Sequence, residues 1–269
     1  DDLSERDVLV LELSSYQLEH LPQDVKRTVD VAAITNIGVD HLERHGTAVR
    51  YRDTKLQLMN LVREGGVSVV PHGELAELAR QQTVERLVTH GAAGDFRLDG
   101  AEAFDHTGKT AVQVADTSAL CVPGEFQRAN LLVALAAGLQ LGLGAEDLHR
   151  GIPDLRGLSH RMESLGRFRA GGGSVEVIDN GVSTTPESTL SAVESVPSAG
   201  RSILVAGGQA KRGVSLEPLA RSLAASGDWI MVPFGAAAAE LARAARQAGA
   251  AVDSGPECAS AEDAALRAM

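Results

Sequence analysis

The sequence predicts an α/β protein of two domains, each built on a parallel sheet covered by helices. Short runs rich in β-branched residues alternate with helical stretches along most of the chain, which is typical of βαβ units. The alternation stops near residue 157 and starts afresh after the glycines at 171–173. Because 269 residues suffice for two ordinary domains, we expect one at 1–157 and another at 158–269.

The elements of the first domain follow from the period of the apolar residues. Runs of alternating or continuous apolar residues predict strands, and apolar residues repeating every three to four positions predict helices. We expect strands at 7–13, 31–37 and 67–70, a helix at 47–63, hairpins within 84–122, and helices at 130–141 and 145–150.

The second domain repeats the alternation. We expect strands at 175–178, 202–206 and 229–232, and helices at 186–196, 216–225 and 236–248. The chain starts at Asp1 without an initiator Met and ends inside a helical pattern that follows a capping Ser260. Both ends therefore indicate a fragment of a longer protein.

Composition excludes several classes of protein. A formal net charge of -11 argues against a nucleic-acid surface, which needs an excess of Lys and Arg. No apolar run approaches the roughly 20 residues of a membrane helix. Cys121 and Cys258 lie far apart in sequence, so neither a disulfide framework nor a zinc site is indicated. A reducing cytoplasm fits this cysteine usage.

Polar side chains follow the first two predicted strands. Glu12 lies near the carboxyl end of strand 7–13, and Asn36, Asp40 and His41 follow the second strand. Open α/β sheets bind ligands at this edge. A histidine oriented by an aspartate can hold a divalent ion there. An outward-facing Glu12 and a solvated turn at 40–41 are the alternatives.

Lys55 shares a helix face with apolar residues. Tyr51, Lys55, Leu58, Met59 and Val62 recur at intervals of three or four residues. Such a lysine either extends to water along its own methylene groups or is a partly buried amine able to react as a nucleophile. The pattern alone favours the first interpretation.

Two glycine-containing segments are candidates for anion binding. Thr-Gly-Lys-Thr at 107–110 imitates the end of a phosphate loop, but the pattern requires glycine where Ala103 stands, so we predict a hairpin turn. Segment 206–213 contains Lys211 and Arg212 between a predicted strand and a helix. Exposed backbone N–H groups and these two cations can meet an anion there.

Taken in order, these segments resemble the Mur ligases, ATP-dependent enzymes that add amino acids to the peptidoglycan precursor. The matching strings are Leu-Glu-Leu-Ser-Ser-Tyr-Gln-Leu-Glu at 11–19, Thr-Asn-Ile-Gly-Val-Asp-His at 35–41, Tyr-Arg-Asp-Thr-Lys-Leu at 51–56, Gly-Leu-Ser-His-Arg-Met-Glu at 157–163, and Gly207-Gly208 with Lys211. The string at 14–19 is most similar to the branch that adds D-glutamate. The resemblance implies part of the family's central parallel-sheet ATPase-type domain, without its upstream phosphate loop, followed by part of a Rossmann-like C-terminal domain.

The resemblance also assigns roles to single residues. Glu12 and His41 match residues that hold Mg²⁺ directly or through water, and Lys55 matches a lysine that carbon dioxide carbamylates. The carbamate would be a third group at the metal. The matches to ATP-contacting residues are Asn130, His160, Arg161 and Asn180, and the matches to substrate-contacting residues are Ser14, Thr184 and Lys211.

By analogy, ATP would phosphorylate the carboxylate of UDP-N-acetylmuramoyl-L-alanine, and the amine of D-glutamate would displace the phosphate. The fragment alone is expected to be inactive. Phe126-Gln127 stands where a His-Asn pair is usual, and Asn180-Gly-Val-Ser-Thr-Thr-Pro186 replaces a string with Asp and Lys. That string resembles variant ligases that add L-glutamate, which is one alternative. A non-catalytic Mur-like protein that binds nucleotide or a cell-wall partner is another.

Overall fold

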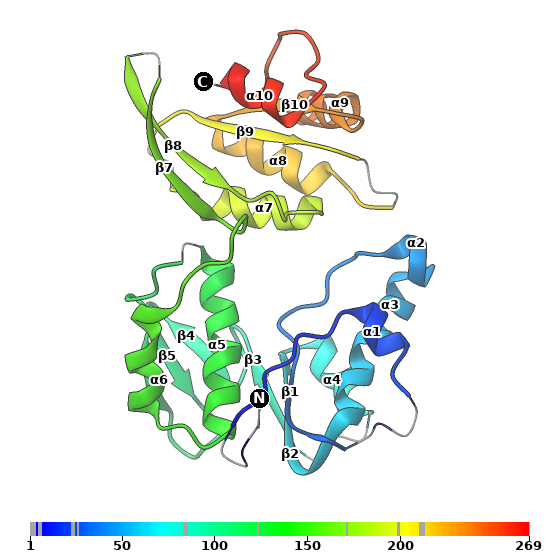
Figure 1. The fold of residues 1–269 in the computed structure, drawn as a ribbon, viewed down its shortest axis with the longest axis vertical. Helices are drawn as coiled ribbons and strands as arrows, with labels where there is room; N and C mark the ends of the chain where they lie inside the picture. Colours follow the sequence, from blue (N-terminus) through cyan, green and yellow to red (C-terminus); the bar gives the residue numbers. More distant parts are fainter. Residues whose placement is uncertain are drawn as a thin grey trace. The chain divides into compact units, whose positions relative to one another are not determined.

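The structure is a computed structural model, and it describes residues 4, 7–22, 25, 27–82, 86–122, 124–170, 172–197, 200–209 and 213–268. The chain forms two compact units (Figure 1). The first comprises residues 1–97, 105–112 and 133–143, and the second comprises 98–104, 113–132 and 144–269. The predicted α/β class is confirmed.

The described residues form both helices and strands. The helices are α1 (Ser15–Glu19), α2 (Leu42–His45), α3 (Ala48–Leu56), η1 (Gln57–Leu61, a 3-10 helix), α4 (Glu74–Arg80), α5 (Glu125–Gln140), α6 (Ala145–Gly151), η2 (Ile152–Asp154, a 3-10 helix), α7 (Pro186–Ser195), α8 (Glu217–Ser226), α9 (Ala238–Ala248) and α10 (Ala261–Ala268). The strands are β1 (Val29–Ala33), β2 (Val62–Pro71), β3 (Leu87–His90), β4 (Phe96–Asp99), β5 (Glu102–Asp105), β6 (Val112–Asp116), β7 (Glu163–Ala170), β8 (Gly173–Asp179), β9 (Ser202–Gly207), β10 (Trp229–Phe234) and β11 (Ala251–Val252).

The larger sheet has the order β1-β2-β3-β4-β5-β6, and β1, β2 and β3 run parallel. Ala33 pairs with Val69, which in turn pairs with Val88. Residues 67–70 of β2 are all buried. Burial on both faces is typical of a parallel strand covered by helices.

One face of β1 and β2 carries the core of the first unit. Leu56 of α3 and Met59 of η1 are almost fully buried against it, and Ala76 and Ala79 of α4 join the same cluster. This packing fixes α3 on the sheet and therefore fixes the backbone that carries Lys55.

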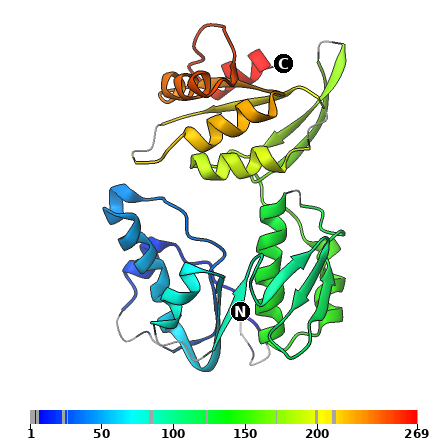
Figure 2. The same cartoon turned by 180° about the vertical axis from the view of Figure 1, so that it is seen from behind.

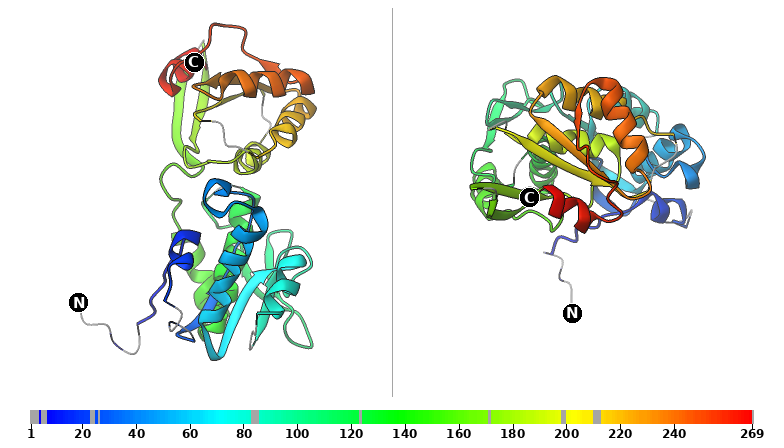
Figure 3. Two further views of the ribbon diagram at one scale, coloured as in Figure 1. Left: turned by 90° about the vertical axis from the view of Figure 1, so that its right-hand side faces the viewer. Right: turned by 90° about the horizontal axis from the view of Figure 1, so that it is seen from above.

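Three predictions for the first domain were wrong: one strand does not form, and two elements end earlier than expected. Residues 7–13 form no strand, because none of the described residues pairs with them and a strand needs a neighbour for its N–H and C=O groups. Figure 3 (left) shows this segment as an extended coil leading into α1. The strand predicted at 31–37 ends at Ala33, and the helix predicted at 47–63 ends at Leu56. The apolar pattern beyond Leu56 belongs to η1 and β2, where β-branched residues favour the strand.

The segment 84–122 has the β character that was predicted, with β3 to β6 among its described residues. However, β3 joins the main sheet in parallel with β2, so it is not part of a hairpin with that strand. The Thr-Gly-Lys-Thr turn at 107–110 connects β5 to β6 and no helix follows it. The rejection of a phosphate loop at this place is confirmed.

In the second unit β9, β10 and β11 form a parallel sheet with helices on both faces (Figure 2). Met231 and Leu204 point to the face covered by α7, α8 and α9, and the alternate residues Val232 and Val205 face α10. This arrangement confirms the predicted Rossmann-like alternation. The antiparallel pair β7 and β8 forms a separate two-stranded sheet, and β7 was not predicted.

Candidate functional site

A candidate site in the first unit is organised by the short helix α1. Ser14 caps this helix: its Oγ accepts from the Gln17 N–H at 3.3 Å, while the Gln17 side chain accepts from the Ser14 N–H at 2.8 Å. Five residues cannot sustain a helix alone in water. Buried Ser15 and Leu18 supply the missing stability by packing against the rest of the unit.

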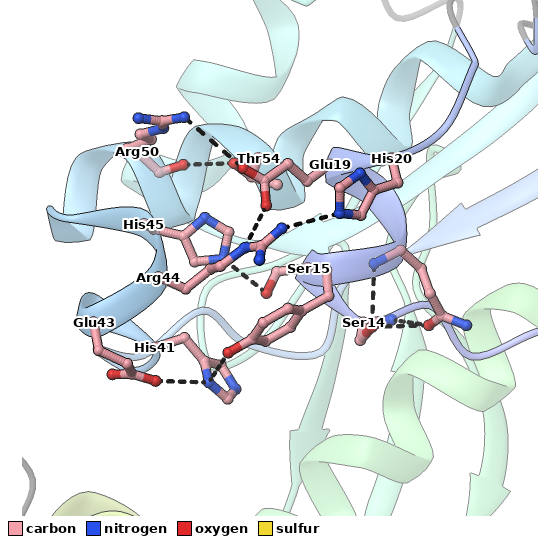
Figure 4. Close-up of polar contacts among 12 residues, drawn as sticks. Ser14, Ser15, Glu19, His20, His41, Glu43, Arg44, His45, Arg50 and Thr54 are labelled. Atoms are coloured by element: carbon pink, nitrogen blue, oxygen red, sulfur yellow. Dashed lines mark hydrogen bonds and ion pairs between the residues drawn. The ribbon is translucent and has the colours of Figure 1, made fainter.

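Polar contacts join α1 to α2, as Figure 4 shows. The Ser15 Oγ lies 3.1 Å from Nε2 of buried His45. The Arg44 Nε donates to the Glu19 carboxylate at 2.9 Å. The string at 14–19, which carried much of the resemblance, therefore acts locally as a docking element for α2. The predicted substrate role of Ser14 stays a prediction.

His41 occupies an unusual backbone position immediately before α2. Its φ of 51° and ψ of 34° are left-handed, which costs a non-glycine residue on the order of 1 kcal/mol. Its N–H donates to the Asp40 Oδ1 at 2.8 Å, which holds this turn. Its Nδ1 lies 3.3 Å from the Tyr16 hydroxyl and 3.5 Å from Glu43 Oε1, and its Nε2 lies 3.7 Å from Asp40 Oδ2.

The ring of Tyr51 connects the predicted residues. The His41 ring lies 6.0 Å from it between centroids, and the Lys55 Nζ lies 5.6 Å from its centroid. Burial, and secondarily the charge of Asp40, raise the pKa of Tyr51. His41 and Lys55 are therefore gathered around one buried aromatic ring. The i, i+4 spacing of Tyr51 and Lys55 was visible in the sequence, but the central position of the ring was not predicted.

One pair of donor atoms near His41 is close enough to share a Mg²⁺ ion, and Lys55 could join it only as a carbamate. Two ligands of one Mg²⁺ lie at most about 4.2 Å apart, and His41 Nε2 and Asp40 Oδ2 meet this limit at 3.7 Å. Lys55 is half-buried and, among the described residues, has no carboxylate within 4 Å. Its ammonium group would repel the ion, whereas a carbamate would supply anionic oxygens. Glu12 is exposed on the extended segment before α1.

His90 fixes the start of the loop that carries His41. Its Nε2 donates to the buried carbonyl of Ile34 at 2.9 Å. Burial lowers the pKa of His90, which favours the neutral ring. Nothing in the sequence pattern indicated this bond, since the two residues belong to β3 and to the loop after β1.

In the second unit His160 pairs with Asp179, and the predicted Asn180 contacts the same loop. The His160 Nδ1 lies 2.7 Å from Asp179 Oδ2, and the His160 N–H donates to Glu163 at 2.8 Å. The Asn180 Oδ1 accepts from the Met162 N–H at 3.2 Å. Within the described residues, His160, Glu163 and Asp179 are the one group of metal-binding type whose donor atoms lie within 4.8 Å of one another. These atoms already bond each other or the backbone.

We predict that His160 and Asp179 shift each other's pKa through their hydrogen bond. The Asp179 hydrogen bond and charge raise the pKa of His160, and the same hydrogen bond lowers the pKa of Asp179. The histidine contribution to stability is thus complete below the unfolded pKa of about 6.5 and lost as pH rises through the folded value. The aspartate contribution is complete above about 3.9 and lost as pH falls through its folded value.

An NMR titration of the His160 imidazole checks this prediction. The pKa is expected above that of a histidine without a charged partner. The variant Asp179→Asn keeps the shape of the side chain and should return the value toward about 6.5. Equal values in the two proteins would contradict the pairing.

The remaining predicted residues of the second unit lie apart from this pair or on its margin. Asn130 and Arg161 are exposed, and the Asn130 side chain donates to Gln127 at 3.3 Å. Thr184 lines a pocket of about 90 Å³ together with Ser183, Thr185 and Gly207. The prediction for Lys211 falls outside the described residues, as does Arg212.

The chain is similar in sequence to known ligases. Residues 2–138 match the family description "Mur ligase middle domain". The UDP-N-acetylmuramoylalanine–D-glutamate ligase of Synechococcus sp. (strain CC9902) is 33% identical over 252 residues, covering 90% of this chain and 50% of that protein. The protein of the same name from Chromohalobacter salexigens is 34% identical over 230 residues, covering 83% and 48%. The chain spans about half the length of the curated relatives it matches.

Solved structures agree in fold. MurF from Acinetobacter baumannii superposes with a TM-score of 0.63 at 24% identity, covering 83% of this chain and 50% of that one. A pseudomurein peptide ligase type C from Methanothermus fervidus gives 0.61 at 15% identity, covering 90% and 58%. In the part of the chain that is described, every helix is too short or too polar to cross a bilayer.

Proposed function

This chain belongs to the Mur ligase family, and from that premise we propose that it forms part of an ATP-dependent ligase that joins D-glutamate to UDP-N-acetylmuramoyl-L-alanine. The observation that carries the proposal is the meeting of His41 and Lys55 around Tyr51. We assign residues 1–157 to the central domain and 158–269 to the C-terminal domain. The reaction belongs to peptidoglycan precursor synthesis in the cytoplasm, and the enzyme acts as a monomer.

The reaction has two steps. The acceptor carboxylate attacks the γ-phosphorus of ATP, which forms an acyl phosphate and releases ADP. The neutral glutamate amine then attacks the acyl carbon, and the tetrahedral intermediate loses a proton from nitrogen and expels phosphate to leave the amide. Both steps require groups that stabilise negative charge developing on oxygen.

The proposed metal residues are Glu12, His41 and a carbamylated Lys55. Bound Mg²⁺ would neutralise phosphate charge as a Lewis acid. Tyr51 positions the Lys55 side chain and excludes water from one side of it, because its ring is buried and lies against the amine. A neutral lysine amine adds to carbon dioxide to give the carbamate and a proton, so the lysine becomes an anionic group. We propose that the nucleotide is contacted by Asn130, His160, Arg161 and Asn180.

The pocket at Thr184 is the proposed glutamate site. Ser183, Thr184 and Thr185 supply hydroxyl groups on its wall. The pocket lies at the N-terminus of α7, whose positive partial charge favours a carboxylate. Ser183 Oγ donates to Ser188 Oγ at 2.8 Å, which holds the loop before α7 against the helix. We keep Ser14 and Lys211 as proposed substrate contacts.

One observation favours a second candidate, addition of L-glutamate. Val182 is 41% exposed in the loop before Thr184, at the position where the D-glutamate branch is expected to carry a lysine. An apolar side chain there cannot pair with a carboxylate. Loss of that cation would change how the site holds the amino acid and hence which enantiomer fits.

A phosphate-release assay on the protein expressed from its complete reading frame tests the proposal. With ATP, Mg²⁺ and UDP-N-acetylmuramoyl-L-alanine, we expect turnover with D-glutamate and a much lower rate with L-glutamate. The control omits the UDP-linked acceptor and should release no phosphate. Turnover with L-glutamate alone would show that L-glutamate is the amino-acid substrate. No turnover with either enantiomer would overturn the ligase assignment.

A further inference from the structure

A tyrosine that no predicted role includes lies against the predicted metal ligand His41. The Tyr16 hydroxyl is 3.3 Å from His41 Nδ1, and the two rings meet edge to face with centroids 5.1 Å apart. We propose that Tyr16 is the positioning residue of His41 and selects the ring nitrogen that is offered to the phosphate-bound Mg²⁺. The inference rests on the proposed function, since it takes His41 as a ligand of that ion.

The surroundings of the two ring nitrogens differ. A neutral imidazole carries one proton and one lone pair, and only the lone pair can bind a metal. Nδ1 faces the Tyr16 oxygen at 3.3 Å and the Glu43 carboxylate at 3.5 Å. Each nitrogen faces a carboxylate, but Nδ1 has two oxygen neighbours and both are nearer to it than Asp40 is to Nε2. The proton is therefore favoured on Nδ1, with the Tyr16 oxygen as its nearer acceptor. Nε2 then keeps its lone pair, 3.7 Å from Asp40 Oδ2.

Tyr16 is itself held from two sides. The Arg44 guanidinium lies over its ring at 5.2 Å from the centroid, and the ring of buried His45 lies 6.0 Å away. Arg44 is fixed in turn by Glu19 of the same short helix as Tyr16. The hydroxyl is therefore presented to His41 from a rigid support, as expected of a group that orients a metal ligand.

Packing alone does not account for the hydroxyl. A phenylalanine would keep the edge-to-face contact with His41 and the cation contact with Arg44. The substitution Tyr16→Phe therefore removes the proposed interaction and leaves α1 docked. We expect it to weaken Mg²⁺ binding about 10- to 100-fold, the usual effect of losing a partner behind a metal ligand. The variant should also populate both tautomers of the neutral His41 ring.

The experiment uses the protein from its complete reading frame, labelled with ¹⁵N. Imidazole ¹⁵N shifts give the tautomer of neutral His41, assigned by comparison with His41→Gln, and calorimetry with MgCl₂ in the presence of a non-hydrolysable ATP analogue gives the ion affinity. The matched control is Gln17→Ala, which weakens the cap of α1 and leaves the Tyr16 hydroxyl, Arg44 and Glu19 in place. It should change neither readout.

The proposal is overturned if Tyr16→Phe leaves the tautomer and the ion affinity at wild-type values. It is equally overturned if Gln17→Ala reproduces both changes, because the effect would then come from the stability of α1. The tautomer is read without the ion. A wild-type protein that binds no Mg²⁺ or turns over no substrate would thus count against the proposed function, while the spectra still decide the role of Tyr16.

Discussion

Replacement of Lys55 by arginine is expected to lower kcat of the complete protein by about 10²- to 10³-fold, the usual cost of losing a group that stabilises transition-state charge. Arginine keeps the positive charge and can keep the contact with the Tyr51 ring. It has no primary amine that can add carbon dioxide. A lysine that served only as a cation would tolerate this change much better than a lysine that becomes a carbamate.

Two measurements check the Lys55 prediction. Steady-state phosphate release gives kcat, and ¹³C NMR after incubation with labelled bicarbonate should show a carbamate signal in the wild type that is missing from Lys55→Arg. The control is Lys109→Arg, at an exposed lysine in the turn between β5 and β6, which should leave rate and signal unchanged. A Lys55→Arg enzyme within threefold of the wild-type rate would contradict the carbamate.

Replacement of Gly207 by alanine is expected to destabilise the second unit by about 3 kcal/mol, at the upper end of the cost of overpacking. A Cβ at this position would lie 2.2 Å from the Phe234 carbonyl oxygen and 2.6 Å from two of its ring carbons. Gly207 pairs with Phe234 in the β9–β10 ladder, so the oxygen cannot move away without disturbing the register. The same glycine lines the proposed glutamate pocket.

Urea unfolding followed by tryptophan fluorescence measures this effect. The single tryptophan, Trp229, lies on β10, so its signal reports the second unit even if the two units unfold separately. We expect the midpoint of the Gly207→Ala variant at clearly lower urea. The control is Gly151→Ala at the end of α6, where an added Cβ meets no atom within 4 Å. A Gly207→Ala midpoint equal to that of the wild type would show that the strand accommodates the methyl group.

The parts of the fold that could be predicted are those with a long, regular apolar pattern. Strand β9, helix α8 and strand β10 appear close to their predicted positions because each buries a face that the sequence displays. Helix α1 could not be predicted, because it has only five residues and depends on its cap and on contacts with α2. The strand predicted at 7–13 failed for a related reason: its pattern was correct for a strand, but pairing is a tertiary property.

The sequence supplied candidate site residues but not the side chains that hold them in place. The resemblance supplied His41 and Lys55, and the structure gathers them around Tyr51. The groups that hold them come from distant positions: Tyr16 lies 25 residues before His41, and Asp179 lies 19 residues after His160. A one-dimensional pattern contains local periodicity and motif spacing, but it does not contain which side chains meet when separate elements pack.

The extended segment before α1 has a consequence for handling the chain. Val8, Leu9, Val10 and Leu11 are 61–85% exposed, and they form an uncharged run of high β propensity. In the described part of the sheet, β1 is an end strand with one paired edge. An exposed apolar run and an open strand edge are the two features through which identical chains associate into intermolecular sheets. We therefore expect the chain as described to associate through this segment at high concentration, and a charged residue within 8–11 to act as a gatekeeper.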